Sequence, residues 1–174
     1  MIISKELRFA SDASLLQAVR KEIADPLTYL HVTEDDIDRA KTIGCEAATN
    51  AIKYAYSQPH RKYRVRLRYH ADRLIITVAD TGKGCDICMV PAPVPGQLGG
   101  YGLFLMRRMA DSIRFRSCRG SGTVVMATVS LHYTSDDALE YAQQLDDLRP
   151  TIIHTADFDI STINALPGPQ SLDC

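Results

Sequence analysis

Three side chains at helical spacing form the most chemically capable group in this sequence: a carboxylate at Glu46, an amide at Asn50 and an amine at Lys53. At about 100° per residue, the three lie within about 60° of one another on one side of a helix. A single carboxylate can deprotonate a hydroxyl group or a water molecule, and a neutral amide oxygen can be a ligand for Mg²⁺. The alternative interpretation is an ordinary solvated helix face.

Two glycine-containing motifs follow this helix. Asp80-Thr81-Gly82-Lys83-Gly84 comes after a predicted strand, and its glycines let a ligand approach the backbone. The Asp80 carboxylate could accept a hydrogen bond from an exocyclic amine such as that of adenine. Gly99-Gly100-Tyr101-Gly102 comes before a predicted helix, whose first N–H groups suit phosphates. Each motif alone also fits an ordinary turn or helix start, but together with Glu46 and Asn50 they predict a nucleotide site.

The hydrophobic pattern predicts the elements that must position these groups. The first helix is expected from Ser11 or Ser14 to Asp25-Pro26, the second from an N-cap at Thr33 to about Tyr56, and the third from Gly102 to Ala110. Strands are expected at 2–9, as an edge strand, and at 63–69, 74–79, 113–116 and 123–133. This order predicts an α+β fold, a two-layer sandwich with helices on one face of a mixed, mostly antiparallel sheet.

Charge divides the chain into two parts. Residues 1–133 hold 19 of the 20 Lys and Arg residues and 13 of the 21 Asp and Glu residues, a net charge of +6, whereas residues 134–174 have a net charge of −7. We therefore expect one domain at 1–133 and an acidic extension at 134–174, with one helix that ends before Pro150 and then a partly ordered tail. The extension could bind a partner, dock on the basic domain, or only keep the end of the chain soluble.

Several features favour simple interpretations. The arginines that alternate with apolar residues from 61 to 73 favour a solvated strand face over a nucleic-acid surface. Cys85 and Cys88 supply only two of the four ligands of a structural zinc site, which argues against a metal or redox role. No apolar run approaches the ~18 residues of a membrane span, and five cysteines without a framework spacing suit reduced thiols. We therefore expect a cytoplasmic protein that does not enter a membrane.

The ordered motifs carry a family resemblance. Glu46-x3-Asn50, Asp80-x-Gly82-x-Gly84, Gly100-x-Gly102 and Gly122-Thr123 resemble the N, G1 and G2 boxes of the Bergerat-fold (GHKL) ATPases, which include gyrases, heat-shock chaperones, histidine kinases and mismatch-repair proteins. Within that superfamily, the chain most resembles the bacterial anti-sigma-factor serine/threonine kinases. Gly102-Leu103-Phe104-Leu105-Met106 and the two helices before the first box carry this closer likeness, which covers about residues 8–131.

The resemblance implies a role for each motif residue. Glu46 would be the general base toward a protein serine or threonine, and Asn50 would be the Mg²⁺ ligand. The other implied contacts are all with ATP: Asp80, Gly82, Gly84 and Thr123 at the adenine, Gly100 and Gly102 at the phosphates, and residues 85–99 as a lid. Lys53 is either a phosphate contact or an ordinary surface lysine.

The resemblance also implies partners. The protein would be an ATP-dependent serine/threonine kinase that phosphorylates a small antagonist protein and regulates a sigma factor or another target, as a homodimer. Two departures leave alternatives open: Tyr54 stands where many anti-sigma kinases have histidine, and the acidic extension has no counterpart in that family's core. The alternatives are a non-catalytic ATP- or ADP-binding module that sequesters a partner, and a detached histidine-kinase catalytic domain.

Overall fold

The structure is a computed structural model that describes residues 2–55, 61–84, 100–148 and 153–158. Its strands are β1 (Ile3–Ala10), β2 (Lys62–Tyr69), β3 (Arg73–Ala79), β4 (Ser112–Cys118), β5 (Gly122–Ser130) and β6 (Ile153–Phe158). They form one sheet in the order β4-β5-β3-β2-β1-β6, antiparallel except where β6 runs parallel to β1. The predicted mixed, mostly antiparallel sheet is therefore confirmed.

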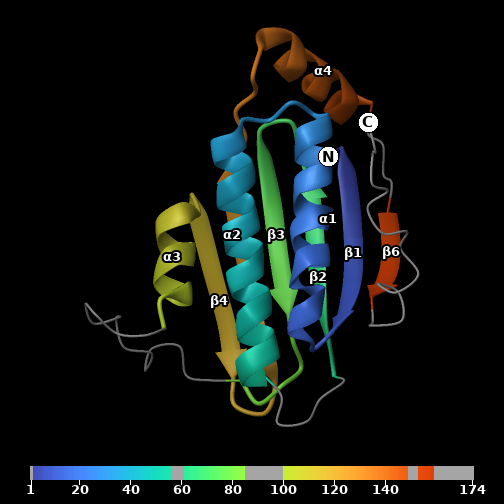
Figure 1. Ribbon diagram of the computed structural model, residues 1–174. Coiled ribbons are helices and arrows are strands. Elements are labelled where there is room, and N and C mark those ends of the chain that lie inside the picture. The colour runs from blue at the N-terminus through green and yellow to red at the C-terminus, as the bar shows by residue number, and fades with distance from the viewer. Residues whose placement is uncertain (1, 56–60, 85–99, 149–152, 159–174) are drawn as a thin grey trace, which may run out of the picture.

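The helices cover one face of this sheet (Figure 1). They are a short 3₁₀ turn η1 (Ala13–Leu15), α1 (Leu16–Tyr29), α2 (Glu34–Asn50), a π-helical turn η2 (Ala51–Ala55), α3 (Gly102–Met109) and α4 (Asp136–Asp147). Figure 1 shows α1, α2 and α3 in front of the strands and α4 across one end of the sheet. The predicted two-layer architecture is confirmed.

Strand β2 shows why this sheet has one covered face. Tyr63, Val65, Leu67 and Tyr69 are at most 1% exposed, while the arginines between them point to the opposite side. Successive side chains of a strand point to opposite faces, so the alternation in the sequence separates a core face from a charged face. Arg64 and Arg66 are exposed on that side and Arg68 is partly buried, and Glu6 on β1 pairs with Arg66 there.

Helix α1 continues through Pro26, where the sequence analysis ended it. A proline has no backbone N–H, so it leaves the carbonyl four residues earlier, that of Glu22, without its helical partner. The buried hydroxyl of Tyr69 on β2 donates to that carbonyl oxygen at 3.0 Å. The predicted end at Pro26 was wrong because a side chain distant in sequence supplies the missing hydrogen bond.

Helix α2 also ends differently from its prediction. The α-helix stops at Asn50 and continues as the π-helical turn η2 instead of running as a regular helix to about Tyr56, which lies outside the described residues. The buried small residues Ala40, Gly44 and Ala48 form a stripe along α2. This stripe packs closely on α1, because a Cβ added at Gly44 would lie 2.3 Å from Ile23 Cδ1. The opposite stripe, with Glu46 and Asn50, is thereby left to face other elements.

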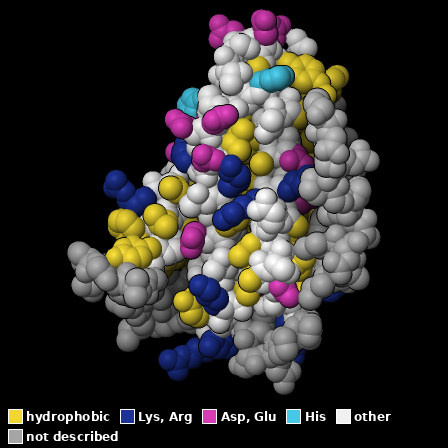
Figure 2. Space-filling model, viewed as in Figure 1, with side chains coloured by type: hydrophobic (Ala, Val, Ile, Leu, Met, Phe, Trp, Pro, Cys, Tyr) yellow, Lys and Arg dark blue, Asp and Glu magenta, His cyan; other side chains and the backbone are white. Residues whose placement is uncertain are grey.

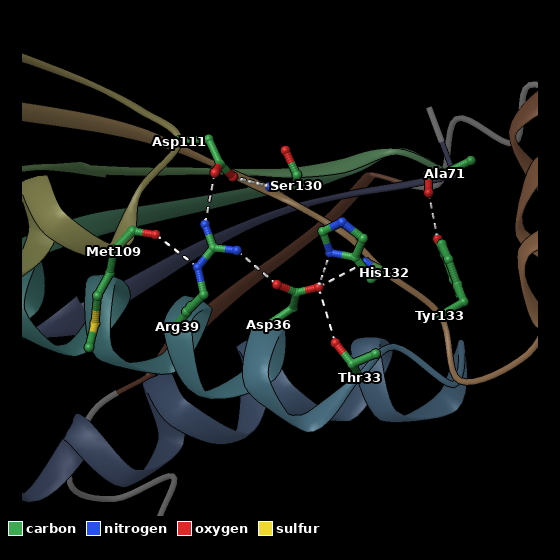
Figure 3. Close-up of polar contacts among 9 residues, drawn as sticks. All are labelled: Thr33, Asp36, Arg39, Ala71, Met109, Asp111, Ser130, His132 and Tyr133. Carbon is green, nitrogen blue, oxygen red and sulfur yellow. Dashed lines mark hydrogen bonds and ion pairs between the residues drawn. The ribbon is translucent and has the colours of Figure 1, made fainter.

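Within the described residues, Asp36 is the only charged side chain that is buried, at 3% exposed. Its carboxylate accepts hydrogen bonds from Thr33 Oγ1 at 3.1 Å, Arg39 Nη1 at 2.8 Å, and the backbone N and ring Nδ1 of His132 at 2.8 and 2.9 Å (Figure 3). Burial alone would raise the pKa of Asp36, but these hydrogen bonds outweigh it and hold the pKa below its ordinary value.

The extension contributes to the fold more than expected. Helix α4 forms as predicted and buries Ala138 and Ala142, with Ser135 accepting a hydrogen bond from the N–H of Ala138 at its start. Residues 153–158 form β6 where the sequence analysis predicted only a tail, so β1 is not the edge strand. Residues 159–174 lie outside the described residues. None of the helices in the described ranges is both long and apolar enough to cross a membrane.

Candidate functional site

A cavity of about 600 Å³ lies where α2, η2, the start of α3 and the ends of β3 and β5 meet. This volume is within the range of roughly 300–1,000 Å³ typical of small-molecule sites. All of the predicted site residues except Gly82 line it: Glu46, Asn50, Lys53, Asp80, Gly84, Gly100, Gly102 and Thr123. The predicted lid at 85–99, with Cys85 and Cys88, lies outside the described residues. The fold therefore brings the three separate motifs to one cavity.

Glu46 and Asn50 lie directly beside the start of α3. A Cβ added at Gly102 would be 2.6 Å from Glu46 Oε2 and 3.7 Å from Asn50 Oδ1. Among the described residues, no hydrogen-bond partner is found for either side chain, so both keep their capacity to bind a ligand. A carboxylate, an amide and a helix N-terminus thus meet within one small region. A helix N-terminus can bind phosphate groups, and a carboxylate beside it can act as a general base.

Asp80 is held by the backbone around it. Its Oδ1 accepts hydrogen bonds from the N–H groups of Gly82 at 2.8 Å and Thr123 at 3.2 Å. Burial raises the pKa of Asp80, and these two hydrogen bonds only partly oppose that effect. Within the described residues Oδ2 has no hydrogen-bond partner, so a fixed acceptor is available to a donor such as an exocyclic amine.

The glycines near Asp80 allow the residues after β3 to lie close to the end of η2 and to the turn between β4 and β5. A Cβ at Gly82 would lie 2.1 Å from the carbonyl oxygen of Ala55, and one at Gly122 would lie 2.1 Å from that of Asp80. Gly82 therefore packs on the end of η2 instead of lining the cavity. Gly84 lines the cavity with φ of +62°, a conformation that favours glycine, and its Cβ would meet the carbonyl oxygen of Cys118 at 2.1 Å.

Lys53 and Tyr54 are exposed side chains of the π-helical turn, and both line the cavity. Single π-helical turns occur frequently at functional sites because they change the direction of side chains within a helix. The position of Lys53 is compatible with a phosphate contact and with a solvated lysine, so its role stays a prediction.

The sequence analysis missed the apolar wall of the cavity. Val78, Val125 and Phe115 come from β3, β5 and β4, and the strand register pairs Val78 with Val125 and Val125 with Phe115. They form one row across the sheet that could support a flat ring. Each of these residues is a core-facing position near a motif residue, which is a signal that the sequence contains. The sequence of one strand does not show which residues of the neighbouring strands lie opposite it, so the row could not be predicted.

Helix α3 borders the cavity and is only lightly buried. Met106 is its one buried side chain, and Phe104 is 46% exposed. Figure 2 shows hydrophobic side chains gathered over α3 and charged side chains of both signs over α2. The Arg107 guanidinium lies 5.5 Å from the ring centre of Phe115, which adds a cation–π contact between α3 and β4.

Comparisons with known proteins agree with this geometry. Residues 9–129 match the family described as histidine kinase-like ATPase domain. The chain is 30% identical to "Serine-protein kinase RsbW" of Bacillus velezensis, over 73% of this chain and 85% of that protein. It is also 30% identical to "Anti-sigma F factor" of Oceanobacillus iheyensis, over 72% of this chain and 90% of that protein.

A solved structure shares the fold. The crystal structure of the RsbU and RsbW domains of a Mycobacterium tuberculosis protein aligns with a TM-score of 0.55 and 17% identity, over 75% of this chain and 34% of that longer chain. At this identity the likeness concerns the fold alone. With the sequence match over most of the chain, the motif order and the shared architecture, the chain belongs to the histidine kinase-like ATPase domain family.

Proposed function

We propose that this protein is an ATP-dependent serine/threonine kinase that acts as an anti-sigma factor or a related partner-switching regulator. The single observation that carries the proposal is the position of Glu46 and Asn50 beside the start of α3, with Gly102 almost in contact with the Glu46 carboxylate. The two relatives named as a serine-protein kinase and an anti-sigma factor support it.

The residues of the cavity suit Mg·ATP. Asp80 would bind the adenine amino group, the row of Val78, Val125 and Phe115 would support the base, and the N–H groups at Gly100 and Gly102 would bind phosphates. Asn50 would be a protein ligand of Mg²⁺, which commonly takes one or two protein oxygens and completes its shell with phosphates and water. When bound, ATP supplies the phosphoryl group for transfer.

Glu46 would act on the partner protein. Its carboxylate would accept the proton of a serine or threonine hydroxyl as that oxygen forms its bond to the γ-phosphorus of ATP, while the bond from this phosphorus to the bridging oxygen breaks and ADP leaves. A carboxylate without hydrogen-bond donors from the described residues suits this role, since nothing in the protein competes for its lone pairs. Phosphoryl transfer depends mainly on positioning and charge neutralisation, so one base and a phosphate cradle are a sufficient protein contribution.

The proposal includes partners and organisation. The substrate would be a small antagonist protein, and the regulated target a sigma factor or a protein with an equivalent role. The family resemblance also supports a homodimer that acts in the cytoplasm, with an ATPase domain at 1–133 and an extension at 134–174 whose strand β6 joins the sheet of that domain. The family match to residues 9–129 supports that division.

The test is transfer from γ-labelled ATP. The purified protein is incubated with Mg²⁺, labelled ATP and proteins captured from the native cell. The proposal predicts an acid-stable label on a small partner, identified as phosphoserine or phosphothreonine by mass spectrometry. An acid-labile label on histidine would instead favour the detached histidine-kinase domain, and nucleotide binding without any transfer would favour the sequestering module.

Asp80→Asn is expected to weaken ATP binding about 10- to 100-fold and leave the fold intact. An asparagine oxygen can still accept from Gly82 and Thr123, but its amide group would then present a donor toward the adenine amino group. Losing a hydrogen bond to a charged group costs about 1.5–3 kcal/mol. Titration with ATP and GTP checks this, because the new donor suits the guanine carbonyl and predicts a shift of preference toward GTP.

The thermal midpoint provides the control for this variant. Because burial raises the pKa of Asp80, its charged form is unfavourable in the folded state, and the neutral amide should therefore unfold at the same temperature or a higher one. A variant that binds ATP like the wild type would show that Asp80 does not contact the base. A large fall in thermal midpoint would show that its main role is structural.

A further inference from the structure

Helices α2 and α3 lie side by side and run in opposite directions (Figure 1). Arg39 and Glu46 are seven residues apart on one side of α2, and Gly102 and Met109 are the first and last residues of α3. Both intervals correspond to about 10 Å of helix. Arg39 contacts the last residue of α3, and Glu46 lies beside the first. The distance between these two contacts is therefore the same along α2 as along α3.

Arg39 holds the end of α3 by two hydrogen bonds. Its Nε donates to the carbonyl oxygen of Met109 at 3.0 Å, and its Nη2 donates to Asp111 Oδ1 at 2.9 Å (Figure 3). Carbonyl groups in the last turn of a helix have no helical partner, and the cation also suits the negative end of the helix dipole. The planar guanidinium makes these contacts in a fixed geometry that an amine cannot reproduce.

The arginine itself is anchored on its other side. Its Nη1 donates at 2.8 Å to Asp36, the buried carboxylate that Thr33 and His132 also bind. Asp111 is fixed in turn by the backbone N–H of Ser130 on β5, at 2.6 Å. The end of α3 is therefore tied through Arg39 to the start of α2 and to the sheet.

Apolar packing constrains α3 through one buried side chain and through Leu103 and Met109, which are partly buried against the core. Met106 is its one buried side chain, whereas the helix must present Gly100 and Gly102 at a defined distance from Glu46 and Asn50. A slip of α3 by one turn along α2 would displace this phosphate cradle by about 5.4 Å. The hydrogen bonds of Arg39 oppose such movement from the side of α2, and the backbone N–H of Asp111, which donates to the Thr128 carbonyl oxygen at 2.9 Å, opposes it from the side of β5.

We infer that Arg39 is a positioning residue of the nucleotide site: it sets the position of α3 along α2, and thereby the distance between the phosphate cradle at Gly100–Gly102 and the pair Glu46 and Asn50. This inference rests on the proposed function, because it assigns Arg39 a role in binding ATP and in phosphoryl transfer. It does not place Arg39 in contact with the nucleotide.

The test compares Arg39→Ala and Arg39→Lys with two controls. Lysine keeps a cation near Asp36 but cannot donate to Asp36, Met109 and Asp111 together. Lys41→Ala removes another cation of α2, one that pairs with Asp38. Leu27→Ala destabilises the fold from a fully buried position on α1 that does not line the cavity. Each variant is assayed below its unfolding temperature for affinity toward a fluorescent ATP analogue and for kcat and KM of transfer.

We expect both Arg39 variants to bind the analogue about 10-fold more weakly, to raise the KM for ATP to a similar extent and to lower kcat at least 10-fold. Partial unfolding alone would reduce the active fraction, and would therefore lower the apparent kcat without changing KM. Leu27→Ala should follow that second pattern, and Lys41→Ala should match the wild type.

Wild-type affinity in both Arg39 variants would overturn the inference, even if their thermal midpoints fall. The wild-type protein decides the proposed function separately. If it binds the analogue without transferring phosphate, the kinase proposal fails and the affinities of the Arg39 variants still decide the role of Arg39. If it binds no nucleotide, both fail.

Discussion

Glu46→Gln is expected to reduce phosphoryl transfer by 10²- to 10⁴-fold while nucleotide affinity stays within about threefold of the wild type. Glutamine has nearly the same shape as glutamate, so the close approach of Gly102 to this side chain is preserved. The amide cannot accept the proton of the attacking hydroxyl, and only the transition state for transfer should be affected. The measurement is kcat for labelling of the partner, together with a fluorescence titration of nucleotide.

Glu34→Gln is the matched control for this experiment. Glu34 is the first residue of α2, about three turns before Glu46, which is the first residue of this helix that lines the cavity. The change removes one carboxylate from the same helix. This variant should transfer phosphate at the wild-type rate. If Glu46→Gln also transferred normally, Glu46 would not be the base. If neither the wild type nor the variants transferred phosphate while all bound ATP, the non-catalytic sequestering module would be the better account.

The loss should lie in kcat and leave the KM for ATP nearly unchanged. Glu46 contacts the reacting hydroxyl in the proposed arrangement, and not the bound nucleotide. An interaction that exists only in the transition state lowers kcat and kcat/KM equally when it is removed. A rise in KM for ATP without a fall in kcat would instead place Glu46 in nucleotide binding, beside Asn50.

The parts of the fold that depend on local patterns could be predicted from the sequence. The alternation of apolar residues and arginines in β2 identified its core face, because the period of a strand is two wherever the strand pairs. The continuation of α1 through Pro26 could not be predicted, because it depends on the Tyr69 hydroxyl more than 40 residues away. Strand β6 was missed for a similar reason: its backbone pairs with β1 at the other end of the chain.

In the candidate site too, features that depend on local motifs could be predicted, and features that depend on contacts between distant residues could not. Glycine and acidic motifs in a fixed order indicated a nucleotide site, and the structure brings Glu46, Asp80 and Gly102 to one cavity. The apolar wall and the Arg39 contacts were missed, since both depend on the register of neighbouring strands and helices. Asp36 follows two other acids in the first turn of α2, and only the position of His132 after β5 shows why Asp36 is the one that is buried.

Gly122→Ala is expected to be strongly destabilising, and Gly120→Ala provides an unusually close comparison. Gly120 lies in the turn and Gly122 is the first residue of β5, and both have positive φ, of +77° and +81°, so an alanine at either position carries a backbone cost of about 1–2 kcal/mol or more. Their surroundings differ: a Cβ at Gly122 would lie 2.1 Å from the carbonyl oxygen of Asp80, whereas a Cβ at Gly120 has no atom within 4 Å.

Gly122→Ala should therefore be the more destabilising of the two variants, because only Gly122 adds a clash to its backbone cost. Because the obstacle at Gly122 is backbone, the β3 and β5 ends must separate, at a further cost of about 1–3 kcal/mol in the free energy of unfolding. That movement also pulls the Thr123 N–H away from Asp80, so ATP affinity should fall with Gly122→Ala and stay unchanged with Gly120→Ala. Urea unfolding and nucleotide titration of both variants test this. Equal stabilities would mean that the contact between these strand ends relaxes freely, and that Asp80 does not depend on it for its position.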